Sequence, residues 1–153
     1  MLFRSLAGPC SSPVPQLAAH RVPQLTARRV LQLTVDYLQE RVQFGRQIGS
    51  FQAIKHRCAD MMVKVESALA AANCAAEAAD AGDADFPMLA AMAKAYCSDA
   101  YFACAGDSIQ LHGGVGFTWE YDPHLFFKRA RASAAMLGDA AYHRERIAVG
   151  LGL

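Results

Sequence analysis

Residues Tyr37 to Met62 read YLQERVQFGRQIGSFQAIKHRCADMM, and two long segments with a helical spacing of apolar residues meet within them at a short polar turn. The turn covers residues 45–50, and we expect Ser50 to cap the helix that follows. Beyond it, apolar residues recur at intervals of three and four, namely Phe51, Ile54, Cys58, Met61, Val65 and Leu69. This spacing places them on one face of a helix. The stretch therefore predicts two long helices joined by a tight turn.

The first of these helices is expected to end in a dense polar cluster, Glu40 to Phe44. The cluster brings together a guanidinium (Arg41), a side-chain amide (Gln43) and an aromatic ring (Phe44). A guanidinium binds phosphate oxygens through a planar fork of donors, so the cluster suits an anion with a flat ring attached. The alternative is a charged helix end that is simply solvated. The residues by themselves leave both interpretations open.

The rest of the chain continues the helical pattern. Helices are expected over about residues 25–43, 51–80, 87–112, 123–137 and 140–149. Gly82 provides a stop for the second helix, and Asp85, Asp122 and Asp139 are suitable N-caps for the three that follow. No stretch alternates between apolar and polar residues for long enough to be a strand. We therefore predict an all-α fold, an antiparallel four-helix bundle with a short extra C-terminal helix.

The composition fits a single helical domain. The chain has 153 residues, of which 54% are hydrophobic and 9% aromatic, and alanine is abundant, as is typical of closely packed helices. A net charge of +1 does not favour a nucleic-acid partner, and no apolar run reaches the roughly 18 residues of a membrane span. The five cysteines show no C-x-x-C spacing, and no carboxylate or histidine cluster accompanies them. We therefore predict buried free thiols and no metal site.

The first 23 residues differ from the rest. They contain Pro9, Pro13, Pro15 and Pro23, which we expect to prevent a helix, and no acidic residue occurs before Asp36. We divide the chain into an irregular proline-rich arm, residues 1–23, and a helical bundle, residues 24–153. An acid-free start with arginine and serine is typical of a mitochondrial transit peptide, whereas the lack of an amphipathic helix favours a disordered arm or a truncated reading frame. We expect a cytoplasmic protein, with the mitochondrial matrix as the alternative.

Two motifs resemble the C-terminal helical domain of the acyl-CoA dehydrogenases. The first is R-x-Q-F-G-x-x-I-x-x-F-Q, from Arg41 to Gln52, and the second is QLHGGVGFTWEYDPHLFFKR, from Gln110 to Arg129. They occur in the family's order, and the resemblance covers about residues 25–149. It implies a flavoprotein oxidoreductase of fatty acid metabolism that uses FAD to oxidise an acyl-CoA thioester. It also implies an oligomer, formed with a second copy of the chain or with a longer acyl-CoA dehydrogenase subunit.

The resemblance further implies which residues bind the cofactor. On the first motif, Arg41 and Gln43 would meet the pyrophosphate of FAD, Phe44 would pack near the nucleotide and Ile48 would line the same pocket. From the neighbouring subunit, Gln110, Gly113 and Gly114 would approach the same cofactor. Glycines allow close approach of the backbone to a ligand. Residues 113–116 taken alone favour a plain turn between helices, whereas their pairing with the first motif favours a ligand. His112, beside them, either faces the flavin site or merely ends a helix.

One departure from the family pattern concerns the catalytic base. Members of the family need a carboxylate that removes a proton next to the thioester. The position that most of them fill with Glu holds Leu137 here, and Asp139 lies two residues further on. The other position used in the family falls at about residues 13–16, which contain no acid. We therefore assign no catalytic residue.

A second departure is that the family's other two domains have no counterpart in the chain. We expect the chain to be inactive by itself and to share FAD with missing domains or with another subunit. It is then either a fragment of an acyl-CoA dehydrogenase or a non-catalytic partner subunit of a mixed oligomer. An unrelated helical interaction module is the third alternative.

Overall fold

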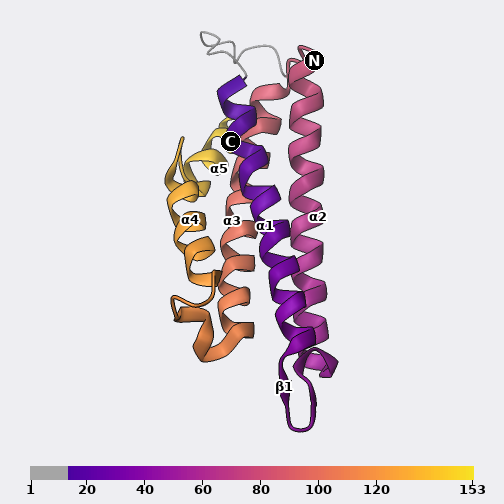
Figure 1. Cartoon of the computed structure of the whole chain (residues 1–153). Helices are drawn as coiled ribbons and strands as arrows, with labels where there is room; N and C mark the ends of the chain where they lie inside the picture. The colour runs from indigo at the N-terminus through magenta and orange to yellow at the C-terminus, as the bar shows by residue number, and fades with distance from the viewer. Residues whose placement is uncertain (1–13) are drawn as a thin grey trace.

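A bundle of four helices, each antiparallel to the next, forms the body of the protein, and a fifth short helix follows it. The computed structural model describes residues 14–153, with side chains from residue 26 onward. The helices are α1 (Val14–Glu40), α2 (Gln52–Asp80), α3 (Phe86–His112), α4 (Pro123–Ala135) and α5 (Ala140–Gly150). Figure 1 shows α1, α2 and α3 running side by side along the length of the molecule. The predicted fold class is confirmed.

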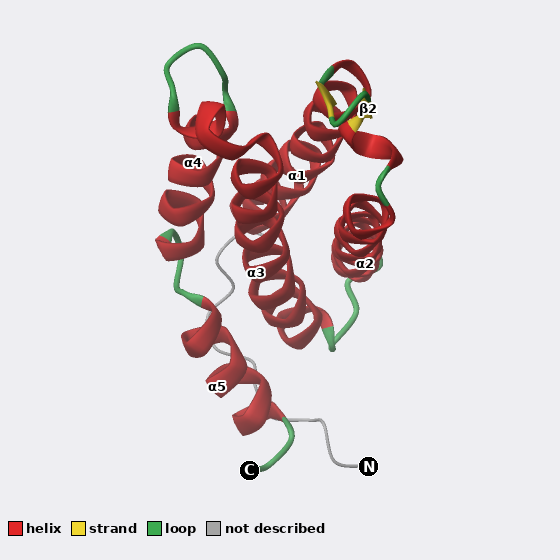
Figure 2. Cartoon of the chain, turned by 90° about the horizontal axis from the view of Figure 1, so that it is seen from below, coloured by secondary structure: helices red, strands yellow, loops and turns green. Residues whose placement is uncertain are grey.

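Helix α3 lies at the centre of the bundle. It contacts α1, α2, α4 and α5, and Figure 2 shows it with α1 and α2 on one side and α4 on the other. Because it has neighbours on several sides, apolar residues face inward around most of its circumference. The centre of the protein is therefore a helix that is buried around most of its circumference, with a narrow exposed stripe at Met92, Tyr96 and Asp99.

The main core lies where α1, α2 and α3 meet. Val30, Met61, Val65 and Tyr101 are almost completely buried there, and burial of a large apolar side chain stabilises the fold by about 1.5–3 kcal/mol. Further along, a second cluster consists only of small side chains from α2 and α3, namely Ala68, Ala72, Cys97 and Ala100. The small residues let the two helices approach closely, as the sequence of the second helix predicts.

The start of α1 corrects one prediction. The helix begins at Val14, about eleven residues before the expected start near Leu25. Pro15 lies in its first turn, where a backbone N–H has no partner within the helix and the fixed φ of proline is suitable. Pro23 lies inside the helix, so proline did not prevent helix formation there. Residues 1–13 of the predicted arm lie outside the described residues, and the boundary between arm and bundle stays a prediction.

The turn between α1 and α2 is also more structured than predicted. It contains a hairpin of two very short strands, β1 (Val42–Gln43) and β2 (Arg46–Gln47), followed by a short 3₁₀ helix, η1 (Ile48–Ser50). Phe44 and Gly45 connect the strands, and both have positive φ, 55° and 73°, which matches the twist of a two-residue hairpin loop. The absence of strands was thus a wrong prediction, because two-residue strands are too short to show alternation.

The helix stops and caps were predicted with mixed success. Gly82, with φ of 65°, follows the end of α2 as expected. The side chain of Asp139 caps α5 by accepting a hydrogen bond from the backbone N–H of Tyr142 at 2.8 Å. Ser50 does not cap α2, because its hydroxyl donates instead to the carbonyl of Gln47 at 2.6 Å. It therefore stabilises the 3₁₀ turn rather than the helix.

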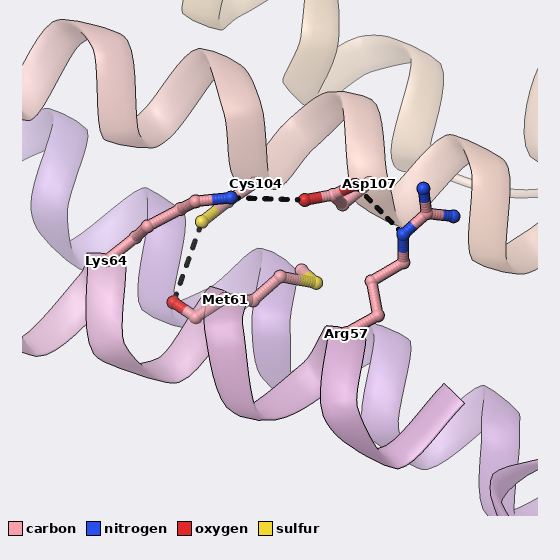
Figure 3. Close-up of polar contacts among 5 residues, drawn as sticks. All are labelled: Arg57, Met61, Lys64, Cys104 and Asp107. Carbon is pink, nitrogen blue, oxygen red and sulfur yellow. Dashed lines mark hydrogen bonds and ion pairs between the residues drawn. The ribbon is translucent and has the colours of Figure 1, made fainter. Parts of the chain in front are cut away.

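One polar cluster links α2 to α3 on the surface, and Figure 3 shows it. Asp107 lies between Arg57 and Lys64, with N–O distances of 3.4 and 3.5 Å. Beside it, the thiol of Cys104 points to the carbonyl oxygen of Met61 at 3.8 Å. Partly exposed ion pairs contribute at most about 1 kcal/mol each. The cluster therefore contributes little to the stability of the contact between α2 and α3.

No cysteine in the part of the chain that the structure describes forms a disulfide, as predicted, but only two of the four are buried. Cys97 and Cys104 are buried, whereas Cys58 is half-buried and Cys74 exposed. Burial raises the pKa of Cys104 to about 11, so its thiol stays protonated and unreactive at neutral pH. Cys10 lies outside the described residues.

Candidate functional site

The two motifs of the sequence meet at one end of the bundle. Helices α1 and α3 run in the same direction, so the hairpin after α1 and the 3₁₀ helix η2 (Gly113–Phe117) after α3 lie at the same end. The ring of Tyr37 stacks on that of His112, with centroids 4.3 Å apart and an interplanar angle of 18°. The Tyr37 hydroxyl also donates a hydrogen bond to the carbonyl of His112 at 3.3 Å. These contacts fix the ends of α1 and α3 against each other.

A cavity with a volume of about 450 Å³ opens between the two motifs. We call it the basic cavity, because Arg41 is the charged side chain in its lining. The residues that line it are Tyr37, Arg41, Gln43, Ile48, Gln110, Leu111, His112, Gly113, Gly114 and Val115. Six of the seven residues that the family resemblance assigns to FAD are among them. They come from segments about seventy positions apart in the sequence, which α1 and α3 bring together.

The polar groups of the basic cavity are available for a ligand. Arg41 is exposed and forms no ion pair with any residue that the structure describes. The side-chain amides of Gln43 and Gln110 likewise have no hydrogen-bond partner in residues 26–153. Gly113 has φ of 66° and ψ of −144°, a conformation that favours glycine, and a Cβ on Gly114 would meet no atom within 4 Å. The cavity thus offers a free guanidinium, two free amides and an open stretch of backbone.

Phe44 is the predicted site residue that does not line the cavity. Its side chain is 91% exposed at the tip of the hairpin, and its ring packs edge-on against that of Phe51 with centroids 6.2 Å apart. Its place near the nucleotide stays a prediction. A single chain presents both motifs on one cavity. The expected sharing of the cofactor site between two subunits stays a prediction.

A second cavity, of about 420 Å³, adjoins the first. We call it the acidic cavity, because four carboxylates line it, those of Asp36, Glu40, Glu120 and Asp122. The two cavities share Tyr37, Arg41, His112 and Val115 in their linings. The sequence interpretation missed this cavity. The sequence did indicate an acidic surface, because Asp36 and Glu40 are four residues apart on one helix face. The other two carboxylates, Glu120 and Asp122, flank Tyr121 after the glycine turn.

His112 forms the wall between the two cavities. Its side chain is 6% exposed, and its Nδ1 lies 2.7 Å from the carbonyl oxygen of Ser108. Because a carbonyl can only accept, Nδ1 carries the proton and donates. Burial lowers the pKa of His112, although the bond to Ser108 partly opposes this, so the ring is neutral at pH 7. His112 is the last residue of α3 and also lines both cavities, so its position fits both sequence interpretations.

The loop that would carry the family's base lies at the other end of α4 from η2. Leu137, at the expected position, has φ of 60°, and its side chain is 59% exposed. Asp139, two residues on, uses its carboxylate to cap α5. His143 donates from Nε2 to the carbonyl of Leu137 at 3.0 Å and holds the loop in place. Neither cavity includes these residues.

Lys94 is a buried charged residue that the sequence interpretation did not single out. It is 3% exposed, and its ammonium group donates to the hydroxyl of Ser98 and to the carbonyl of Ser133, each at 2.9 Å. Ser133 lies in the last turn of α4, where a cation satisfies free carbonyls and interacts favourably with the helix dipole. Burial lowers the pKa of Lys94. The residue positions the end of α4 and thereby the loop at Leu137.

The structure shows neither a metal site nor a membrane span in the part that it describes. No three His, Cys, Asp or Glu side chains within residues 26–153 lie together as metal ligands would. No described helix is both long and apolar enough to cross a bilayer.

We expect the stability of the protein to fall as the pH is lowered below about 6.5. Burial lowers the pKa of both His112 and His143 in the folded state. Between these lowered values and the ordinary value of about 6.5, the unfolded chain binds more protons than the folded one, so acid favours unfolding. The free energy of unfolding in urea, measured at pH 7.5 and 5.0, tests this. His143→Gln should reduce the difference, whereas the exposed control His56→Gln should not.

The fold gives the class of this protein, and its similarity to known proteins gives its family. An antiparallel bundle with a cofactor-sized cavity at one end is common to many helical proteins. Residues 19–152, however, match the family model described as acyl-CoA dehydrogenase, C-terminal domain. The chain therefore belongs to the acyl-CoA dehydrogenase family and corresponds to its C-terminal helical domain. This overturns the alternative of an unrelated helical module.

Individual relatives agree with this assignment. The chain is 50% identical over 103 residues to the acyl-CoA dehydrogenase IpdE2 of Mycobacterium tuberculosis, and the match covers 67% of this chain and 30% of that protein. It is 44% identical over 114 residues to the acyl-CoA dehydrogenase FadE34 of the same organism, which covers 74% of this chain and 16% of that one. The chain thus spans less than a third of the length of either relative.

Solved structures show the same fold. A crystal structure of acyl-CoA dehydrogenase from Geobacillus kaustophilus matches with a TM-score of 0.87 and 26% identity, over 91% of this chain and 36% of that one. A structure of the glutaryl-coenzyme A dehydrogenase glutaryl-CoA complex matches with a TM-score of 0.85 and 32% identity, over 90% of this chain and 35% of that one. The bundle therefore corresponds to about a third of the length of each of these enzymes.

Proposed function

We propose that this chain serves as the C-terminal helical domain of an acyl-CoA dehydrogenase, where it helps to bind FAD and to hold subunits together. The observation that supports this most directly is the basic cavity. Six residues assigned to FAD from the sequence line it, although they belong to two motifs far apart in the chain. If either motif had a role unrelated to the cofactor, the two motifs would not need to lie on the same cavity.

The chemistry of the cavity fits the diphosphate of FAD. Arg41 would pair with phosphate oxygens through its planar fork of donors, and the side-chain amides of Gln43 and Gln110 would donate further hydrogen bonds. Gly113 and Gly114 leave the backbone open to close approach. FAD, when bound, would accept the hydride released from an acyl-CoA thioester. The residues of this chain would bind and orient the cofactor without taking part in that step.

Assembly with other subunits is supported by apolar side chains on the outside of the bundle. Met62 and Val63 of α2 and Met92 and Tyr96 of α3 are between 43% and 65% exposed. The two pairs lie at different heights along the bundle, and exposed large apolar side chains of this kind are typical of surfaces that another subunit covers. The expected partner is a second copy or a longer acyl-CoA dehydrogenase subunit.

A non-catalytic partner subunit of a mixed oligomer is the second candidate function, and the loop at Leu137 favours it. Leu137 cannot accept a proton, and the carboxylate of Asp139 is already used to cap α5. A subunit of this kind would complete the FAD site of another subunit while the latter supplies the base. In both cases we expect no oxidation of acyl-CoA by the chain alone, since the reaction needs a proton acceptor beside the substrate.

A visible absorption spectrum tests the proposal and separates its two forms. The protein would be purified alone and after co-expression with a full-length homologue. Flavin bands and a mixed oligomer found only after co-expression would support the partner subunit. Flavin bands from the chain alone would support a domain that holds the cofactor without another subunit. A chain that remains monomeric and colourless in both preparations would contradict FAD binding and assembly.

Arg41→Ala should weaken flavin binding in whichever preparation retains it. The substitution removes charge-assisted hydrogen bonds to phosphate, so we expect a loss of about 1.5–3 kcal/mol, roughly a 10- to 150-fold loss of affinity. Fluorescence of released FAD after dialysis measures the retained fraction. Arg29→Ala is a matched control, because Arg29 is also exposed on α1 but does not line either cavity. Equal retention by both variants would contradict the assigned role of Arg41.

A further inference from the structure

The loop between α4 and α5, residues 136–139, is held by two buried side chains. Figure 2 shows α4 and α5 following one another along α3, with this loop between them. His143, in the first turn of α5, donates a hydrogen bond from Nε2 to the carbonyl of Leu137 at 3.0 Å. Lys94 of α3 donates to the carbonyl of Ser133 at 2.9 Å and holds the end of α4. We call the loop, His143 and Lys94 together the α4–α5 clasp.

The backbone of the loop lies directly over the ring of His143. Leu137 has φ of 60°, a left-handed conformation that residues other than glycine rarely adopt, so the loop does not favour this shape by itself. A Cβ on Gly138 would clash with the ring of Tyr142 and would lie 3.1 Å from Nε2 of His143. The ring of His143 therefore cannot leave its pocket without displacing the loop.

The pocket is built for a neutral His143. The side chain is 6% exposed, and because a carbonyl can only accept, Nε2 carries the proton and Nδ1 carries a lone pair. Nδ1 is buried and has no hydrogen-bond partner among the described residues. A proton added to Nδ1 would create a buried charge and a buried donor that has no acceptor. The closed clasp therefore disfavours the imidazolium form.

The charged groups around the ring also oppose its protonation. Lys94 from α3 and Arg146 from α5 are positive, and Asp139 of the loop is negative. Burial and the two cations lower the pKa of His143, although the bond to Leu137 and the charge of Asp139 partly oppose this. The carboxylate of Asp139 is already used to cap α5. Other charged side chains of these helices have other partners, as in the contacts Arg144–Asp99 and Arg131–Phe102.

We propose that acid opens the α4–α5 clasp: the loop is closed while His143 is neutral, and protonation of Nδ1 drives the ring into water and displaces the loop. The proton acts as a ligand that binds the open form more tightly. An exposed histidine has a pKa near 6.5, whereas that of the closed form is lower. Between these two values, each unit of pH raises the ratio of open to closed clasps by up to about tenfold. The clasp works without a cofactor, so the proposal goes beyond the proposed function.

Amide hydrogen exchange of the full chain, followed by nuclear magnetic resonance between pH 7.5 and 5.0, tests this. The backbone N–H groups of Tyr142 and His143 both bond to Asp139 and report on the clasp. After correction for the intrinsic pH dependence of exchange, their protection should fall by up to about tenfold per pH unit below about pH 6.5. The imidazole ¹⁵N signals should show that Nδ1 of His143 gains the proton. A protonated Nδ1 at pH 7.5 would overturn the proposal.

The urea dependence of exchange separates a local opening from global unfolding. A local opening exposes little surface, so low concentrations of urea should speed the exchange of the Tyr142 and His143 amides much less than that of Val65 and Tyr101 in the main core. The protection of the first pair should also be lower than that of the second at every pH. If all four amides had the same protection and the same urea dependence, the clasp would open only when the whole protein unfolds, and the proposal would be overturned.

A substitution at His143 identifies the group that titrates. In His143→Gln the side-chain amide can still donate to the carbonyl of Leu137, but it gains no proton in this pH range. The protection of the Tyr142 amide should therefore lose most of its pH dependence. His56→Gln is the control, because His56 is exposed on α2, and it should behave as the wild type does. An equal pH dependence in the wild type and in His143→Gln would overturn the role of His143.

Two further variants leave the ring in place and change only the charge around it. Arg146→Gln removes a positive charge, so at low salt the opening should begin at a higher pH. Asp139→Asn keeps an oxygen that can cap α5 but removes a negative charge, so the opening should begin at a lower pH. The pH midpoint of the His143 ring signals measures both shifts. A midpoint that is unchanged in both variants, or that moves in the reverse directions, would contradict the proposal.

Discussion

Tyr101→Ala is expected to lower the free energy of unfolding by about 3–5 kcal/mol, the range found when a large aromatic residue is removed from a core. Tyr101 is 1% exposed and is the largest of the completely buried side chains. Its neighbours in the main core, among them Met61 and Cys104, come from the central contact of α2 and α3. These helices cannot move together to fill the space, because small side chains already hold them close further along. Urea unfolding followed by circular dichroism measures the loss.

Tyr101→Phe is the matched variant, and it should raise the free energy of unfolding rather than lower it. The Tyr101 hydroxyl is buried and has no hydrogen-bond partner among the described residues. Burial raises the pKa of Tyr101 to about 12, so the group stays neutral. Removal of an unpaired buried hydroxyl should raise the free energy of unfolding by about 1 kcal/mol, because the cost of its dehydration disappears. A loss of stability in Tyr101→Phe would instead show that the hydroxyl has a partner, such as an enclosed water molecule.

The helices could be predicted because the spacing of their apolar residues is typical of a helix. In α2, Met61 and Val65 follow the spacing of one helix face, and both are buried as that spacing requires. The N-terminal start of α1 could not be predicted in the same way. Proline was taken as a breaker, whereas Pro15 in the first turn is compatible with a helix. The hairpin at Phe44 was missed because its geometry depends on positive φ at two residues and not on a hydrophobic pattern.

The basic cavity could be predicted only through the resemblance of its two motifs to a family. Nothing in the spacing of Arg41 and Gln110 shows that they meet, since their proximity depends on the packing of α1 against α3. The acidic cavity and the orientation of His112 depend on the same packing and on the tautomer that Ser108 selects. A carboxylate at a helix end is usually solvated, so Glu40 by itself did not indicate a cavity. The structure is needed to show which polar residues share a surface.

Gly116→Val is expected to destabilise the protein by about 3 kcal/mol, the upper end of the usual range for overpacking. A Cβ at residue 116 would lie 2.7 Å from the carbonyl oxygen of Ile109 and 3.2 Å from Cβ of His112. Both are parts of the last turns of α3, and a backbone carbonyl cannot move aside as the end of a long side chain can. The 3₁₀ helix η2 would have to lift away from α3. The loss can be measured in urea.

The same substitution should also weaken ligand binding, because η2 carries the glycine wall of the basic cavity. Gly114→Ala separates the two effects. A Cβ there meets no atom within 4 Å, so stability should change by less than about 0.5 kcal/mol, yet the new methyl group would occupy the space next to a bound diphosphate. We therefore expect Gly116→Val to lose both stability and affinity for FAD, and Gly114→Ala to lose affinity alone. If Gly116→Val were as stable as Gly114→Ala, η2 would be free to move relative to α3, and the cavity wall would not be held in advance of the ligand.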